Sequence, residues 1–114
     1  MTIEQLNQQL NLNAVNFTTT ISVIDNNYIF TPTKFINDET INEANSNNGS
    51  CKIFYYAKLH NLSEQATLNA FGDFYTKDVL ENPNGNDHAN IRNFIKTGWD
   101  GIKFYDNALQ KNNV

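Results

Sequence analysis

Apolar residues recur every three or four positions in several parts of the chain, which is the spacing of one face of an α-helix. This pattern predicts helices over residues 2–12, 18–28, 51–60, 64–71 and 88–97, with a shorter helical turn over residues 74–80. The candidate N-caps are Thr2, Ser50, Ser63 and Asp87. Their side-chain oxygens can accept hydrogen bonds from the free amides of a first helical turn. At the end of the last helix, Gly98 suits a left-handed cap and Trp99 is placed to contact Phe94.

The segment over residues 51–60 has two interpretations. Residues 53–56 (Ile-Phe-Tyr-Tyr) have the composition of a strand, yet the apolar and aromatic residues of the segment also fall at helical spacing. A cap at Ser50 before the segment and a polar break at residues 61–63 after it favour a helix.

Aromatic and β-branched residues predict strands in three other places. Residues 28–36 surround Pro32, and because proline cannot donate to a sheet ladder we expect an edge strand there. A turn over residues 37–39 would lead into a second strand over residues 40–44, which completes a hairpin. Residues 101–105 alternate in polarity and are expected to join the sheet of this hairpin.

These elements predict an α+β fold in which several helices pack on a small antiparallel sheet. A length of 114 residues suits one domain over residues 1–114. After Asp106 we expect a frayed tail, because chain ends are poorly ordered unless other elements hold them.

Composition excludes several classes of protein. The 12 acidic and 8 basic residues give a net charge of −4, which argues against binding to a nucleic-acid backbone. There is no apolar run long enough to cross a membrane and no signal-peptide pattern, so we expect no membrane association and a cytoplasmic location. The chain contains 21 asparagines, which take surface positions that charged residues usually fill.

Cys51 is the only cysteine, which rules out an intramolecular disulfide and a metal site with four thiolate ligands. We expect neither a metal nor a cofactor, since no metal-binding or phosphate-loop spacing is present.

The first candidate site is the run Asn48-Gly49-Ser50-Cys51-Lys52. If Ser50 begins a helix, its free amides, its hydroxyl and Lys52 would form an anion site, and the helix dipole would lower the pKa of Cys51. The alternative is an ordinary loop-to-helix turn with a buried, inert thiol.

The second candidate site is the start of the last predicted helix, where His88, Asn90 and Arg92 stand. His88 and Arg92 lie one turn apart, so a base or hydrogen-bond donor would stand beside the only arginine of the chain. The alternative is structural, with Asp87 as cap and Arg92 paired to a carboxylate that fixes the loop. A third candidate, Glu43 at a strand end, would orient His88 or Lys52 or stay in solvent.

Five stretches of the chain carry a resemblance to a known family: residues 31–33 (Thr-Pro-Thr), 42–44 (Asn-Glu-Ala), 48–54 (Asn-Gly-Ser-Cys-Lys-Ile-Phe), 87–94 (Asp-His-Ala-Asn-Ile-Arg-Asn-Phe) and 98–104 (Gly-Trp-Asp-Gly-Ile-Lys-Phe). With these stretches in this order, the chain resembles the HopJ type III effector family of small bacterial proteins over residues 2–109. The resemblance implies secretion into a host cell and assigns no reaction. Residues 1–20 are rich in amides and threonine, as export signals are, yet their helical pattern indicates a segment that belongs to the fold.

We therefore expect a binding or host-interaction module whose partner is a host or bacterial protein or a small anionic ligand. The candidate pocket residues are Glu43, Asn48, Ser50, Cys51, Lys52, His88, Asn90 and Arg92. The alternative is a small enzyme that uses Cys51 as nucleophile or His88 as base. Of the asparagines, we expect Asn42, Asn48, Asn90 and Asn93 to matter most, because they lie inside the family-like runs.

Overall fold

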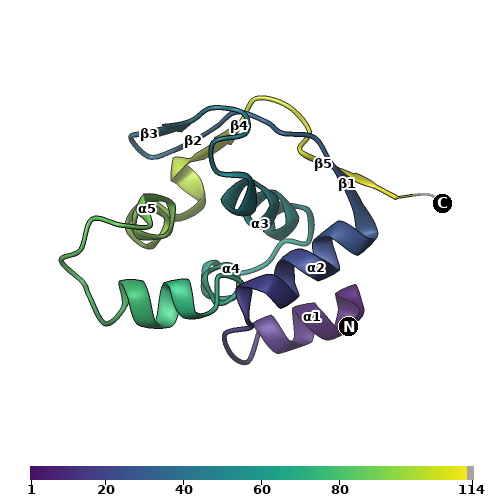
Figure 1. Cartoon of the computed structure of the whole chain (residues 1–114), viewed down its shortest axis with the longest axis horizontal. Coiled ribbons are helices and arrows are strands. Elements are labelled where there is room, and N and C mark those ends of the chain that lie inside the picture. The colour runs from purple at the N-terminus through teal and green to yellow at the C-terminus, as the bar shows by residue number, and fades with distance from the viewer. Residues whose placement is uncertain (113–114) are drawn as a thin grey trace.

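The computed structural model describes residues 1–112 and has an α+β fold, as predicted. The helices are α1 (Ile3–Leu10), α2 (Phe17–Asn27), α3 (Asn48–Leu59), α4 (Glu64–Asn69) and α5 (Ala89–Thr97), with a π-helical segment η1 (Phe74–Val79) and a 3₁₀ turn η2 (Gly98–Gly101). The strands are β1 (Tyr28–Phe30), β2 (Phe35–Asn37), β3 (Thr40–Asn42), β4 (Ile102–Phe104) and β5 (Leu109–Lys111). In Figure 1 the strands run along one side of the molecule and the helices lie beneath them, with α3 in the middle. None of the described helices is long and apolar enough to cross a membrane.

The strands form two small antiparallel sheets. One has the order β3-β2-β4, and Phe35 of β2 stands opposite Asn42 on one side and Phe104 on the other. This confirms both the hairpin and the prediction that residues 101–105 join its sheet. The other sheet pairs β1 with β5, so that Tyr28 faces Lys111.

The prediction of one strand over residues 28–36 is wrong, because the chain leaves one sheet and enters another around Pro32. The last ladder bond on one side runs from the amide of Thr31 to the carbonyl of Ala108, and β2 begins at Phe35. Proline carries no amide hydrogen and has a fixed φ, so a continuous ladder through this position is not available.

The prediction of a frayed tail after Asp106 is also wrong over the described residues. Ala108 and Leu109 are buried in the core, and β5 pairs with β1 along its length. The tail is ordered because this pairing satisfies its backbone and buries its apolar side chains. Residues 113 and 114 lie outside the described part of the chain.

Helix α3 forms the centre of the core and resolves the choice between helix and strand. The side chains of Ile53, Phe54, Tyr56 and Ala57 are all buried. A strand would send neighbours to opposite faces, whereas the wide apolar stripe of a central helix buries adjacent pairs. The helix begins earlier than predicted, at Asn48, so Ser50 lies inside its first turn and is not the N-cap.

The other predicted N-caps are confirmed with one exception, while the helix predicted over residues 64–71 ends at Asn69. Thr2 forms a capping box with Gln5, and the Ser63 hydroxyl accepts a hydrogen bond from the Ala66 amide at 3.0 Å. The exception is Asp87, since the N-cap of α5 is His88 and the Asp87 carboxylate binds Arg92.

After α5 the chain reverses at Gly98, where φ is +59°, a backbone conformation that favours glycine. Trp99 then contacts the Phe94 ring edge-on at a centroid distance of 5.0 Å, as predicted.

Candidate functional site

A cleft of about 360 Å³ opens where the first turns of α3 and α5 meet η1. The residues that line it through apolar groups are Phe17, Phe71, Phe74, Ala89 and Ile91. The polar residues that line it are Thr40, Asn47, Ser50, His88 and Asn90, and Gly49 also lines it. We call this hollow the α3–α5 cleft. It combines an aromatic wall with hydrogen-bonding groups, the usual composition of a small-molecule site.

His88 is the N-cap of α5 and has an uncommon backbone conformation. Its φ and ψ are +50° and +51°, the left-handed region that side chains other than glycine seldom adopt. Such conformations cost free energy and cluster at functional sites. The imidazole is held by its surroundings, because Nε2 lies 3.0 Å from Oδ2 of Asp78 and the ring packs 5.1 Å from the ring of Phe74.

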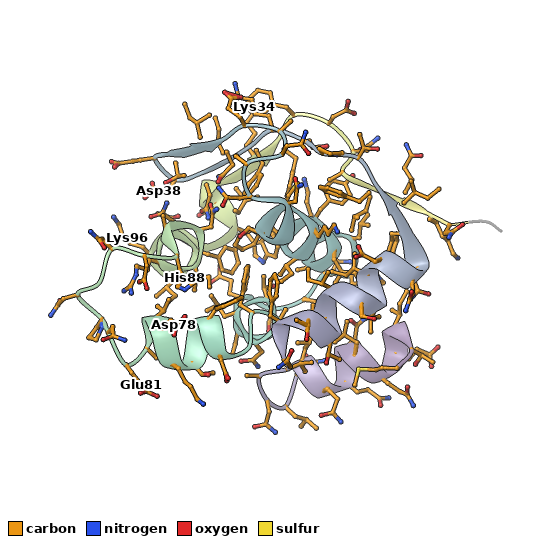
Figure 2. All side chains as sticks on the ribbon, in the orientation of Figure 1. Lys34, Asp38, Asp78, Glu81, His88 and Lys96 are labelled. Carbon is orange, nitrogen blue, oxygen red and sulfur yellow. The ribbon has the colours of Figure 1, made fainter. Side chains whose placement is uncertain are left out.

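Both residues that hold His88 belong to η1. Phe74 and Asp78 are four positions apart on one side of this helical segment, and Figure 2 shows Asp78 next to His88 between η1 and α5. A single π-helical turn is rare and often occurs at functional sites. The conformation at His88, the π-helical turn and the Asp–His pair therefore coincide at one edge of the cleft.

On the opposite side, the first turn of α3 comes close to the aromatic wall. A Cβ added at Gly49 would stand 2.7 Å from the Phe17 ring, so glycine permits this close approach. Ser50 follows and also lines the cleft.

The first turns of α3 and α5, both of which line the cleft, have no side-chain cap among residues 1–112. The Asn47 side chain donates to Oδ1 of Asn42 at 2.7 Å and the His88 side chain bonds to Asp78, so neither caps its own helix. In the described part of the chain, the amides of Ser50 and Asn90 have no protein acceptor. Such amides are donors for an oxygen of a ligand.

Buried amides connect this first turn of α5 to the hairpin. Asn90 is 6% exposed and exchanges two hydrogen bonds with Asn42, at 3.0 and 2.9 Å. Asn37 donates to the Asn90 carbonyl at 2.8 Å, and Asn93 donates to the Thr40 hydroxyl at 2.9 Å. This asparagine cluster fixes the floor of the cleft.

Of the residues proposed from the sequence, the cleft brings together Ser50, His88 and Asn90. Asn48 begins α3, but its side chain turns toward Asn45 at 3.4 Å. Glu43 is exposed and lies 3.9 Å from Lys34.

Lys52 points toward α2, where its ammonium pairs with Asp25 at 2.9 Å and lies 4.9 Å from the centre of the Phe30 ring. Neither Lys52 nor Glu43 lines the cleft.

Arg92 holds the loop before α5. It donates to the carbonyls of Asn82 and Asp87 at 2.8 and 2.6 Å and to the Asp87 carboxylate at 2.7 Å. The pKa of Asp87 is lowered, chiefly because this carboxylate accepts the hydrogen bond from Arg92. This arrangement matches the structural alternative for Arg92.

Of the two interpretations of Cys51, the structure matches the buried, inert thiol, and the helix dipole does not activate it. The thiol is buried one turn inside α3, and its Sγ lies 3.5 Å from the Thr33 carbonyl. Burial raises its pKa to about 11, because the charged thiolate loses solvation. Cys51 is therefore a protonated core residue and does not line the cleft.

Sequence reasoning missed Asp78 and the aromatic wall. Asp78 precedes His88 by ten residues, and no motif links carboxylate and imidazole at that spacing. The usable signal was the predicted helical turn over residues 74–80, in which Phe74 and Asp78 share one side. Over residues 1–112, no group of three or more His, Cys, Asp or Glu side chains could hold a metal ion.

Comparisons with known proteins give the family. Residues 3–109 match the family described as HopJ type III effector protein. The fold is similar to a crystal structure of a protein of unknown function, VPA0580, at 49% sequence identity and a TM-score of 0.94, covering 98% of this chain and 95% of that one. No curated protein matches the sequence. The chain therefore belongs to the HopJ type III effector protein family.

Proposed function

We propose that this HopJ-family chain is a binding module and that the α3–α5 cleft is its ligand site. The observation that carries the proposal is the coincidence of open helix amides, the Ser50 hydroxyl and the His88 imidazole beside the rings of Phe17 and Phe74. A ligand that presents oxygen atoms to the amides and a flat apolar group to the rings would satisfy both halves of the cleft.

A binding role is favoured over catalysis because the candidate nucleophile, Cys51, is buried and protonated. The enzyme alternative based on Cys51 requires an accessible thiolate, whereas this thiol is buried and its pKa is raised to about 11. The Ser50 hydroxyl forms no hydrogen bond with His88 in the described structure, so it is not an activated nucleophile there either.

Chemical-shift titration by NMR with a panel of small aromatic compounds tests the proposal. We expect the amide signals of Gly49, Ser50, Ala89 and Asn90 to move with one or more compounds. Phe74→Ala should weaken that binding about threefold to tenfold, because it removes part of the aromatic wall.

The matched control is Tyr105→Ala, which removes a half-exposed ring outside the cleft and should leave the affinity unchanged. The proposal fails if no compound moves these signals. It also fails if the shifts gather instead around the hollow beside Trp99 and Leu62.

We also propose that the chain acts inside the producing cell and that residues 1–20 are not an export signal. Helix α1 begins with a formed capping box, and its Leu6 and Leu10 side chains are fully buried. A segment with these contacts is part of the fold, whereas export signals are unstructured. A reporter fused to residues 1–20 should stay inside cells that have an active type III apparatus, and efficient translocation would overturn this proposal.

A further inference from the structure

The α3–α5 cleft is nearly free of formal charge. Among the described residues, none that lines it is Lys, Arg, Asp or Glu. His88 is its only ionisable side chain among them, and the other polar side chains are neutral amides and hydroxyls. Arg92 and Lys52, the cations nearest in sequence to the two first turns, are bound to Asp87 and Asp25. A ligand with a full charge would lose solvation in the cleft and would meet no charged Lys, Arg, Asp or Glu side chain in its described lining, only the partial positive charge of the two helix starts.

The residues around His88 determine which nitrogen of its imidazole carries the hydrogen and which can accept a hydrogen bond. A carboxylate can only accept a hydrogen bond, so the short contact to Asp78 places the hydrogen of the neutral ring on Nε2. Nδ1 is then an acceptor, and within residues 1–112 it has no hydrogen-bond donor. Besides Asp78, the charged groups near the ring are Asp87, with Oδ2 4.0 Å from Nε2, and Arg92, which binds Asp87.

The residues that line the cleft therefore include both an acceptor and donors, from α3 and from α5. Among the groups of the lining residues, Nδ1 of His88 is an acceptor without a protein donor in the described chain, whereas the Ser50 hydroxyl and the amides of Ser50 and Asn90 can donate. A carboxylate would satisfy the donors and leave Nδ1 unmatched, and an amidinium would do the reverse. A carboxamide has both an oxygen acceptor and a nitrogen donor within one flat group.

We propose that the ligand of the cleft is an uncharged aromatic or apolar amide. Its N–H donates to Nδ1 of His88, its carbonyl oxygen accepts from the amides or hydroxyl at the helix starts, and its ring packs against Phe17 and Phe74. Asp78 is a positioning residue that sets the tautomer of His88. This inference rests on the proposed function, because it names the ligand class for that cleft.

Three compounds of the same shape test the ligand class: benzamide, benzoate and benzamidine. NMR titration of the folded chain should give the tightest binding for benzamide, by about threefold or more, since each unmatched polar group costs a hydrogen bond. Tighter binding of benzoate or benzamidine would overturn the inference. If none of the three binds while other compounds from the wider panel do, this inference falls and the proposed function stands.

The role of Asp78 is tested by Asp78→Asn, whose amide can donate to Nε2 and so reverse the tautomer. Benzamide binding should weaken about fivefold, the loss of about one hydrogen bond. Asp73→Asn removes the same charge at the start of η1, where the carboxylate pairs with Lys77, and should have no effect. A second readout needs no variant: the imidazole ¹⁵N shifts of His88 should report hydrogen on Nε2, and hydrogen on Nδ1 would overturn the assignment.

Discussion

At the residue scale, the side-chain amide is the group that organises this protein around its cleft. An asparagine can donate and accept at once, so Asn42 and Asn90 satisfy each other across the gap between β3 and α5. Asn37 of β2 donates a hydrogen bond to Asn90 of α5, and Asn93 of α5 donates one to Thr40 of β3. These buried amides contribute structure, in contrast to the asparagines that only cover the surface.

Asn90→Ala should lower the free energy of unfolding by about 2–4 kcal/mol, because it removes both side-chain hydrogen bonds with Asn42 and one of the two from Asn37, and leaves the buried Nδ2 of Asn42 with only a 3.5 Å contact to the Thr40 carbonyl. Urea unfolding followed by circular dichroism measures the change. Asn26→Ala on the exposed face of α2 is the control and should shift stability by less than about 0.5 kcal/mol. Equal midpoints for the two variants would contradict a structural role for the cluster.

At the element scale, α1 shows how local signals and packing agree. The Thr2 cap and the spacing of Leu6 and Leu10 predict the helix, and both leucines are fully buried. The face that they form lies toward the rest of the molecule, whereas Leu12 after the helix is 72% exposed. A helix of eight residues is marginal by itself, so this packing supplies most of its stability.

Leu6→Ala should therefore cost about 2–5 kcal/mol, the usual range for a leucine removed from a packed core. Leu12→Ala makes the same chemical change at an exposed position and should be almost neutral, within about 0.5 kcal/mol. Thermal unfolding of both variants beside the wild type measures the difference. A neutral Leu6→Ala would show that α1 does not contribute to the stability of the fold.

At the scale of the whole molecule, His60 at the end of α3 connects this helix to α1 and β1. Nε2 lies 2.7 Å from the Tyr28 hydroxyl and Nδ1 lies 3.5 Å from Nδ2 of Asn7 in α1. The Tyr56 hydroxyl donates to Oδ1 of Asn7 at 2.6 Å. Burial lowers the pKa of His60 and raises those of Tyr28 and Tyr56, since each charged form would lose solvation.

The lowered pKa of His60 gives overall stability a pH dependence of known sign. Below about pH 6.5 the unfolded chain binds a proton at this histidine that the folded chain resists, so stability is lost as pH falls from there toward the folded pKa. Urea unfolding at several values between about pH 5 and pH 7.5 should show this loss. His60→Gln should reduce the slope, and an unchanged slope would mean that other groups cause it.

Most elements could be predicted from the chain because their signals are local. The caps at Thr2 and Ser63, the hairpin and the Phe94–Trp99 contact depend on residues close in sequence, and all are confirmed. Some errors are local, such as the caps placed at Ser50 and Asp87, and the others concern distant partners. The pairing of β1 with β5 joins segments some 80 residues apart, and no local pattern shows that the tail will find that edge.

The candidate site follows the same division. Ser50, His88 and Asn90 were identified because they stand at helix starts, and the cleft gathers these three. Arg92 and Lys52 were grouped with them because of their charge, but Arg92 binds Asp87 and Lys52 binds Asp25. A salt-bridge partner depends on which surfaces face each other after folding, and residue type alone does not specify it.

The helix-rich α+β class and the approximate places of the helices can be predicted from the amino acids alone, because caps, breakers and periodicity act over a few residues. The folded chain is needed to see that the starts of α3 and α5 share one cleft, that Asp78 binds His88, and that Cys51 is buried with a raised pKa. These properties arise from contacts between segments brought together by burial of the core, and burial sets both the solvation of a group and the partners within its reach.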